Sequence, residues 1–219
     1  MNRRTFLSRL AFLSIFQAIA LSPLSAFFSS ASSKIKKIIL PHGTKRQDLI
    51  DKDPARLDPR NLDITPLREF GTMGLSDYRI TLKHWQLRVE GHVDKPLALS
   101  YERITFLPAM EKKVLLICPG VFANYGVWKG VSIKSLLKEA GASKKVTHVT
   151  ISGPESRFNK TERFSIQDVL DDKLFLAYAV NGVMLPQKHG YPLRLVAEGQ
   201  YGFRWVKYVD RIRAEIIKD

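Results

Sequence analysis

Short apolar runs dominate the chain after its first third, and they predict strands. Residues 85–90 alternate between apolar and polar side chains, which indicates a half-buried strand that ends at a turn around residues 94–96. Residues 114–117 are all apolar, as in a fully buried strand, and the run ends at Cys118, where residues 119–120 are Pro and Gly. Cys118 is therefore expected at a corner between a strand and a loop.

Four further segments continue this strand-rich pattern. Residues 146–152 and 193–196 are typical of buried strands, and residues 208–217 alternate with a period of two. Residues 175–185 predict a hairpin, because the Asn-Gly pair at residues 181–182 adopts the positive φ of a tight turn at little cost.

The helical signals are few and short. Apolar residues at helical spacing follow a capping serine in three places, at Ser100 before residues 101–107, Ser132 before residues 133–140 and Ser165 before residues 166–170. Helices this few cannot cross over between every pair of strands. The pattern therefore favours an α+β fold over a doubly wound parallel sheet.

The first 31 residues have the layout of an export signal. Arg3 and Arg4 precede an apolar run over residues 10–21, and small residues follow as far as Ala31. The arginine pair followed by Thr-Phe-Leu resembles the twin-arginine signal, whose route carries folded proteins with their cofactors already inserted. An ordinary secretory signal or an uncleaved anchor is the alternative. Both place the domain outside the cytoplasm, and we expect a periplasmic protein.

The remaining chain divides into two expected parts. Residues 32–63 are rich in lysine and turn-forming residues without a long amphipathic period, which predicts a linker and an irregular arm. Residues 64–219 form the expected domain. After the signal, no stretch approaches the roughly 18 apolar residues that a membrane span needs.

Composition and charge narrow the classes of function. The 219 residues are 45% hydrophobic and 26% charged, which is ordinary for a globular protein and excludes a disordered or fibrous chain. The formal charge is +14, and removal of the three arginines of the signal leaves +11. Such a charge suits nucleic acid, an anionic membrane surface or an acidic partner. Export argues against nucleic acid.

Cys118 is the only cysteine, and in an exported protein that is unusual. Cysteines normally pair in an oxidising compartment, so a lone thiol is a buried apolar residue, a reactive nucleophile or a metal ligand. A nucleophilic pair with His148 or His189 is one alternative, but no acyl-transfer signature accompanies it.

Three sequence blocks together resemble one family. Residues 118–130 run Cys-Pro-Gly-Val-Phe to Trp-Lys-Gly, residues 177–194 contain Ala-Tyr-Ala-Val-Asn-Gly and His-Gly-Tyr-Pro-Leu-Arg, and residues 201–207 are Tyr-Gly-Phe-Arg-Trp-Val-Lys. In order and spacing they are similar to the sulfite-oxidase-type molybdopterin-binding oxidoreductases. Within that family, Glu-Phe-Gly-Thr at residues 69–72 and Tyr-Gly-Phe at residues 201–203 look most similar to catalytic subunits of periplasmic protein-methionine-sulfoxide reductases.

The resemblance implies a fold, a cofactor and a set of binding residues. The implied fold is the sulfite-oxidase-like molybdopterin-binding fold, strand-rich with a few short helices. The implied cofactor is molybdenum-molybdopterin, with Cys118 as catalytic residue and thiolate ligand of the metal, a soft donor that suits a sulfur-rich coordination. The implied cofactor-binding residues, matched by position, are Thr65, Arg68, Glu69, Thr150, His189, Arg194, Trp205, Val206 and Lys207. Taken singly, most of these have a plain structural alternative, such as a surface charge or a strand threonine.

The implied activity is two-electron oxygen-atom transfer. Whether the substrate is oxidised or reduced is inferred from an arginine that this sequence lacks. Sulfite-oxidising members tend to carry an arginine just past the block at residues 69–70, whereas residues 71–74 are Gly-Thr-Met-Gly. We therefore expect reduction of S-oxides such as methionine sulfoxide. The alternatives are sulfite oxidation and a non-catalytic binding module without metal. The molybdenum content of the purified protein would distinguish a metal-free module from an enzyme.

Two further expectations concern the pocket and the partners. Phe122, Tyr125 and Trp128 would supply aromatic walls if the loop after Cys118 faces the metal, while residues 154–163 replace a longer loop of the reductases. The resemblance implies a small or protein-bound S-oxide as substrate and a haem-bearing membrane protein as electron donor. We expect a monomer.

Overall fold

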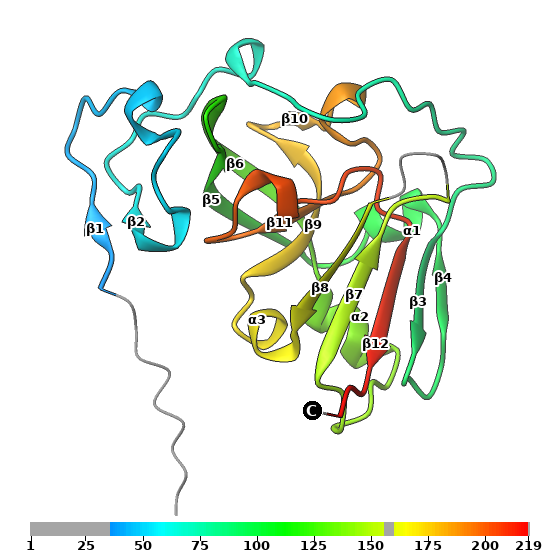
Figure 1. Ribbon diagram of the computed structural model, residues 1–219. Helices are drawn as coiled ribbons and strands as arrows, with labels where there is room; N and C mark the ends of the chain where they lie inside the picture. The colour runs from blue at the N-terminus through cyan, green and yellow to red at the C-terminus, as the bar shows by residue number, and fades with distance from the viewer. Residues whose placement is uncertain (1–35, 156–159, 219) are drawn as a thin grey trace, which may run out of the picture. The chain divides into compact units, whose positions relative to one another are not determined.

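The computed structural model describes residues 36–155 and 160–218, and the predicted export signal lies outside them. The described chain forms two five-stranded sheets (Figure 1). The first has the order β10-β9-β6-β5, with β11 also paired to β9, and all of its strand pairs are antiparallel. Its strands are β5 (Ala109–Cys118), β6 (Phe122–Ser132), β9 (Leu174–Val180), β10 (Val183–Met184) and β11 (Arg194–Ala197).

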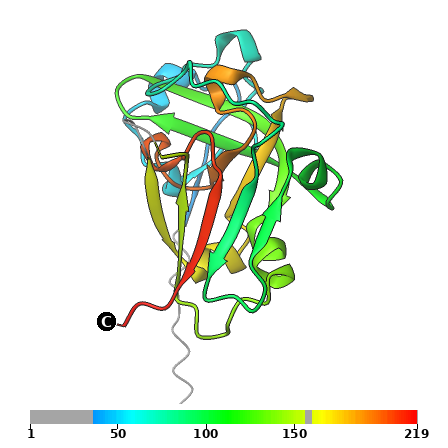
Figure 2. The same ribbon diagram turned by 90° about the vertical axis from the view of Figure 1, so that its right-hand side faces the viewer.

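The second sheet has the order β4-β3-β12-β7-β8. Its strands are β3 (Leu87–Gly91), β4 (Leu97–Leu99), β7 (His148–Ser152), β8 (Thr161–Ser165) and β12 (Arg211–Glu215). The C-terminal strand β12 pairs in parallel with β3 and antiparallel with β7, and Figure 2 shows it in red between these two neighbours. The chain thus returns at its end to the middle of the second sheet.

Three short helices accompany the sheets, which confirms the strand-rich α+β prediction. They are α1 (Tyr101–Thr105), α2 (Ile133–Glu139) and α3 (Ile166–Leu170). Each begins after the predicted serine, whose hydroxyl accepts a backbone N–H three residues on, as Ser165 does from Asp168 at 3.2 Å. Five 3-10 turns complete the fold, namely η1 (Arg46–Leu49), η2 (Pro54–Arg56), η3 (Leu67–Glu69), η4 (Gln187–His189) and η5 (Gly202–Arg204).

Strand β6 differs from the sequence prediction, which treated the residues after Cys118 as a loop. Only residues 119–121 turn, and the chain then runs for 11 residues between β5 and β9. The strand is buried on most positions of both faces and contains Asn124 and two glycines, so no alternation marks it. The side chain of Asn124 lies inside the protein because it bonds both the N–H and the carbonyl of Gly71, at 3.2 and 3.1 Å.

Two other strands were also not predicted. Both β4 and β8 lie at the edges of the second sheet and are short. In β8 only Phe164 is buried, so its sequence carries little of the apolar signal that distinguishes strands from loops.

The segment expected as linker and irregular arm packs on the first sheet. Its described part contains β1 (Ile38–Ile39) and β2 (Leu57–Asp58), which pair in parallel. Three of its leucines are buried in a cluster with side chains of β5 and β6, whose members are Leu40, Leu49, Leu57, Leu115, Ile117, Ala123 and Tyr125. These leucines have no regular spacing, so the sequence pattern did not reveal the contact. The boundary expected between residues 63 and 64 stays a prediction.

Gly130 sits where the pairing of β6 with β9 shifts register. A Cβ at this position would lie 1.9 Å from the carbonyl oxygen of Leu176 and 2.6 Å from the Cα of Ala177, both backbone atoms of β9. We expect Gly130→Ala to lower the free energy of unfolding by about 3 kcal/mol, the upper part of the range for overpacking, because the backbone cannot yield locally. Urea denaturation measures it. The matched control is the exposed neighbour Lys129, whose change to Ala should stay within about 0.5 kcal/mol of the parent. Equal stabilities of the two variants would contradict the conclusion that the β9 backbone leaves no room for a Cβ at residue 130.

Within the described residues, no helix has the length and apolar character required to span a membrane.

Candidate active site

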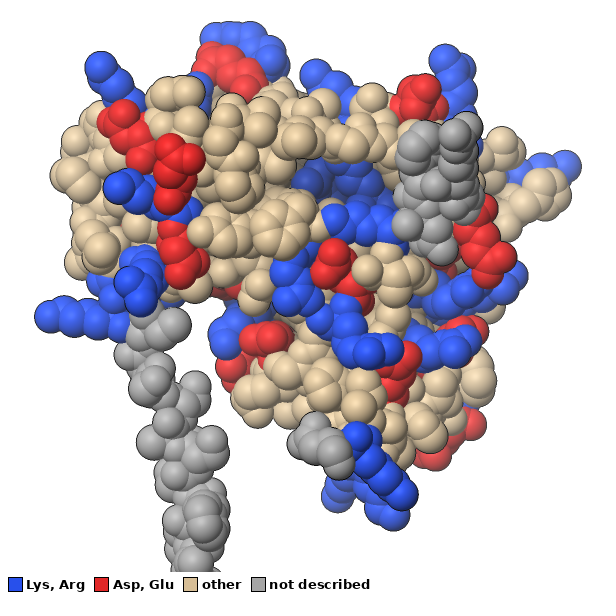
Figure 3. All heavy atoms as spheres, in the orientation of Figure 1, with Lys and Arg blue, Asp and Glu red and all other residues tan. Residues whose placement is uncertain are grey.

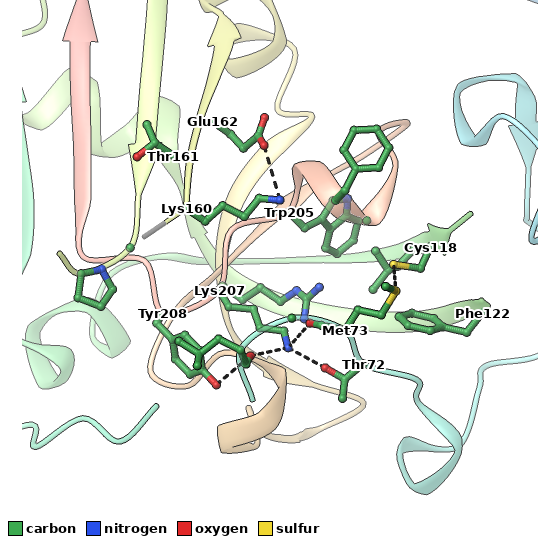
Figure 4. A pocket seen from close by; sticks show the side chains of 18 residues that line it. Thr72, Met73, Cys118, Phe122, Lys160, Thr161, Glu162, Trp205, Lys207 and Tyr208 are labelled. Carbon is green, nitrogen blue, oxygen red and sulfur yellow. Dashed lines mark hydrogen bonds and ion pairs between the residues drawn. The ribbon is translucent and has the colours of Figure 1, made fainter. Parts of the chain in front are cut away.

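A cavity of about 610 Å³ opens beside the end of β5. It is lined from four parts of the chain that are far apart in sequence: residues 72–75, the β5–β6 hairpin, the segment joining β7 to β8, and the C-terminal third. The face in Figure 3 is hollowed near its centre, with basic side chains visible inside the hollow. Figure 4 shows the side chains that point into the cavity.

Cys118 lies at the last position of β5 and lines the cavity, as the sequence predicted for its place at a strand end. Its Sγ atom lies 3.5 Å from the Sδ atom of Met73. Turn η5 passes so close that a Cβ at Gly202 would lie 3.2 Å from the thiol sulfur and 2.9 Å from a methyl group of Leu116. Burial raises the pKa of the Cys118 thiol, and the cations Arg194, Lys160 and Lys207 oppose this rise. The thiol is thus held by sheet and turn at the edge of a basic cavity.

Arg194 is a buried cation in the wall of the cavity. Its side chain is 5% exposed, and the guanidinium carbon lies 5.7 Å from the centre of the Trp128 ring and 5.5 Å from that of Trp205. One nitrogen donates to the carbonyl of His189 at 3.0 Å, whereas Nε has no hydrogen-bond partner among the described residues. Burial lowers its pKa to about 10, so it remains charged at neutral pH.

No carboxylate among the described residues pairs with Arg194. A buried charge without a counter-ion is costly, and proteins normally compensate such a charge. A guanidinium is a side chain that can bind an oxyanion through two parallel hydrogen bonds. The cavity is therefore suited to a ligand that carries negative charge.

Lys207 is the second cation of the wall, and it holds a segment of chain across the cavity. Its ammonium donates to Thr72 Oγ1 at 2.7 Å and to the carbonyls of Met73 and Leu75 at 2.9 Å each. Burial and the nearby Arg194 lower the pKa of Lys207 to about 8. All three donors of this ammonium are in use.

Three more of the predicted cofactor-binding residues lie around Arg194. Trp205 lines the cavity, and Val206 is buried, with a carbonyl that accepts the N–H of Leu195 at 2.8 Å. His189 is buried against Phe70, and its Nε2 atom has no hydrogen-bond partner in the described part of the chain. Burial and nearby cations lower the pKa of His189 to about 4, so this imidazole is neutral at pH 7.

The other four predicted residues do not line the cavity. Thr65 is fully buried, and its hydroxyl accepts the backbone N–H of Tyr125 at 2.9 Å. Arg68 has an 83% exposed side chain, and Glu69 pairs with Arg46 at 2.6 Å. Thr150 donates to Glu215 at 2.8 Å.

Near Thr150, Gly153 just beyond the end of β7 lines the cavity in its place. The cofactor contacts of Thr65, Arg68, Glu69 and Thr150 stay predictions.

The expectation of three aromatic walls is wrong for two of the residues. Phe122 lines the cavity, but Tyr125 belongs to the cluster that packs under the N-terminal arm, and Trp128 is fully buried in the main core. The cause is β6. Tyr125 lies on the face opposite to Phe122, because successive side chains of a strand point to opposite faces. Trp128 is on the same face as Phe122 but six residues further along the strand, where it packs in the main core. Phe203 from η5, Trp205 and Tyr208 supply further aromatic side chains to the cavity.

Sequence reasoning did not find the part of the wall that β8 supplies. Lys160, Thr161 and Glu162 line the cavity from the start of this strand. The charges of Lys160 and Glu162 did not mark them as site residues in the sequence, because neighbouring basic and acidic residues are common on any solvated edge strand.

Comparison with known proteins places these features in context. A family model described as the oxidoreductase molybdopterin binding domain matches residues 75–216. The chain is 31% identical over 144 residues to the protein-methionine-sulfoxide reductase catalytic subunit MsrP of Gluconobacter oxydans strain 621H, which covers 59% of this chain and 46% of that protein. It is 30% identical over 156 residues to the uncharacterized oxidoreductase YuiH of Bacillus subtilis strain 168, covering 71% of this chain and 77% of that protein.

A solved structure shares the fold. The sulfane dehydrogenase SoxCD from Paracoccus pantotrophus superposes with a TM-score of 0.61 at 22% sequence identity, over 84% of this chain and 51% of that one. The chain thus spans about half the length of both this structure and the MsrP protein. The two-sheet architecture is the sulfite-oxidase-like molybdopterin fold that the sequence blocks predicted.

Proposed function

The chain belongs to the oxidoreductase molybdopterin-binding domain family of molybdenum-dependent oxidoreductases, and we propose that it reduces S-oxides by two-electron oxygen-atom transfer. The family's cofactor is molybdenum-molybdopterin. When bound, this cofactor supplies the redox chemistry, while the protein supplies binding, orientation and a shaped pocket.

The residues of the cavity fit this cofactor. Cys118 would bind the metal as a thiolate, because the charge of the metal would outweigh the burial that raises the pKa of the thiol. Arg194 would bind the terminal phosphate of the pterin, and the charge of Lys207, whose three donors are already in use, would favour the anion from a distance. The unpaired Nε atom and missing carboxylate of Arg194 are the observation that carries this assignment, since they leave a buried charge that an anionic cofactor would compensate.

The direction of the reaction rests on the side chains that remain for the substrate. Met73, Leu75, Phe122 and Phe203 give the cavity apolar surface. No arginine occurs in residues 69–74, and Arg163 pairs with Glu215 at 2.9 Å and does not line the cavity. A neutral S-oxide needs apolar walls and one donor, whereas sulfite needs a fixed cation because an anion is costly to desolvate alone.

The metal-loaded protein, supplied with a reduced artificial dye, should reduce methionine sulfoxide and dimethyl sulfoxide. We expect kcat/KM for these S-oxides to exceed that for sulfite oxidation by about tenfold or more, because an uncompensated anion in the pocket costs upwards of 1.4 kcal/mol. Both reactions are assayed on one preparation of known molybdenum content. Efficient sulfite oxidation without detectable sulfoxide reduction would overturn the direction and leave the cofactor assignment intact.

The proposal also covers the cellular compartment, the electron donor and the oligomeric state. The pattern of the first 31 residues supports export to the periplasm by the twin-arginine route, which would deliver the folded protein with its cofactor. A haem-bearing membrane protein would donate the electrons, and the basic surface suits docking to an acidic partner. We propose a monomeric protein acting on small or protein-bound S-oxides.

A further inference from the structure

We propose that Lys160 and Glu162 determine the charge of the substrate that the cavity accepts. In this account, the carboxylate of Glu162 cancels the positive charge of Lys160, so that the substrate side of the cavity presents hydrogen-bond donors without net charge and discriminates against oxyanions. The inference rests on the proposed function and names the residues that give it its specificity.

The two side chains lie at the start of β8 and line the cavity together (Figure 4). Lys160 Nζ is 3.6 Å from Glu162 Oε1, and their side chains are 38% and 22% exposed. The other carboxylate oxygen, Oε2, accepts from Arg204 Nε at 3.0 Å. Arg204 itself is placed by the ring of Phe164, 4.3 Å from the guanidinium carbon. Glu162 is thus fixed between two cations and has little freedom to turn out of the cavity.

Glu162 determines the net charge that the described cavity wall presents to a substrate. The charged residues that line the cavity are Lys160, Glu162, Arg194 and Lys207. Arg194 and Lys207 are the cations we assign to the anionic cofactor. Among the described residues of the wall, Lys160 is then the cation left for a substrate, and Glu162 is the anion that neutralises it. An incoming oxyanion meets the carboxylate of Glu162 beside Lys160, the residue just before β8 that could bind it, and like charges brought close together repel.

A neutral S-oxide does not meet that obstacle. The Lys160 ammonium retains donors beyond the one directed at Glu162, so it can still donate a hydrogen bond to the S–O oxygen. The pair therefore favours a polar, uncharged acceptor over a charged one of similar size.

The decisive variant is Glu162→Gln, which keeps the shape of the side chain and an oxygen that accepts from Arg204. Calorimetry with inorganic sulfate, an unreactive oxyanion of the size of sulfite, measures binding to the metal-loaded protein. We expect sulfate to bind the variant about tenfold more tightly than the parent, with a gain that shrinks as ionic strength rises, since the pair is partly exposed. The ratio of sulfite oxidation to S-oxide reduction should rise in the same variant.

Three further proteins make the result specific. The double variant Lys160→Met/Glu162→Gln should lose the gain; if it keeps the gain, Arg204 is the responsible cation and the assignment to Lys160 is overturned. Lys160→Met alone should bind sulfate more weakly than the parent. Glu155→Gln removes an equal charge from a side chain that is 80% exposed and absent from the cavity wall, and it should bind sulfate as the parent does. Thermal melting of every variant verifies that each is folded.

Failure of this inference and failure of the proposed function look different. Unchanged sulfate binding in Glu162→Gln would overturn the role of the pair, even if the parent reduces S-oxides well. A parent that oxidises sulfite and reduces no S-oxide would overturn the proposed function, whereas sulfate binding would still report whether Glu162 repels anions.

Discussion

Changing Cys118 to serine should leave a folded protein that has lost its turnover. A hydroxyl is a hard and weakly acidic donor, so it is a poor replacement for a thiolate in a sulfur-rich metal site. We expect activity to fall by more than ~100-fold, which exceeds the usual effect of changing a residue that merely orients a metal ligand. The measurement is S-oxide reduction per molybdenum, together with the absorption that a metal-thiolate bond contributes.

A control variant distinguishes the loss of a metal ligand from the loss of a packing contact. The Sγ atom contacts Met73 and lies beside Gly202, so a lost packing contact is the alternative explanation for any effect. Met73→Leu disturbs the same contact and keeps the thiol, and it should retain most of its turnover. Full activity in Cys118→Ser, or equal losses in both variants, would refute the role of Cys118 as metal ligand.

Changing Arg194 to methionine should empty the site without weakening the fold. A charge-assisted hydrogen bond is worth roughly 1.5 to 3 kcal/mol, which corresponds to a loss of about 10- to 150-fold in affinity for the pterin phosphate. The cofactor-free protein should melt at the same or a higher temperature, because the substitution removes a buried charge that lacks a carboxylate partner in the described chain. The measurements are molybdenum and pterin content after purification, and melting of the cofactor-free form.

Arg194→Lys tests the geometry of the same contact. It keeps the charge but not the planar fork of the guanidinium, so its cofactor content should lie between those of the parent and the methionine variant. If Arg194→Met retained its cofactor, or destabilised the cofactor-free protein strongly, then Arg194 would be a structural residue of the core around Trp128.

The sequence predicted the parts of this fold whose signals are local. Serine caps, an Asn-Gly turn and unbroken apolar runs depend on neighbouring residues, and they located the three helices, the β9–β10 hairpin and the end of β5. Strand β6 and the N-terminal arm depend on partners far away in the chain. The side chain of the buried Asn124 forms hydrogen bonds with Gly71, and Leu40 packs against a sheet whose residues come some 75 positions later. Neither contact leaves a pattern in its own segment.

The site shows the same division. Cys118 was expected from its solitary occurrence at a strand end, and Arg194, Trp205 and Lys207 from family resemblance, and these four residues line the cavity. Thr65, Arg68, Glu69 and Thr150 were matched by position alone, and the structure does not gather them there. Glu162 was not predicted because the role we propose for it depends on its contacts with Lys160 and Arg204, which only the folded chain brings together.

The place of Cys118 in the sheet bears on how easily electrons can enter and leave the site. The thiol belongs to a ten-residue strand whose register with β6 continues without a break from Ala109 to Cys118, opposite Phe122. A side chain anchored in this way has few alternative positions, and the adjoining Gly202 backbone restricts it further. A ligand that stays in place when the oxidation state changes keeps the reorganisation energy low, since little of the surrounding protein has to move. If Cys118 is the metal ligand that we propose, the long β5–β6 hairpin would hold its sulfur atom in one place in both oxidation states of the metal.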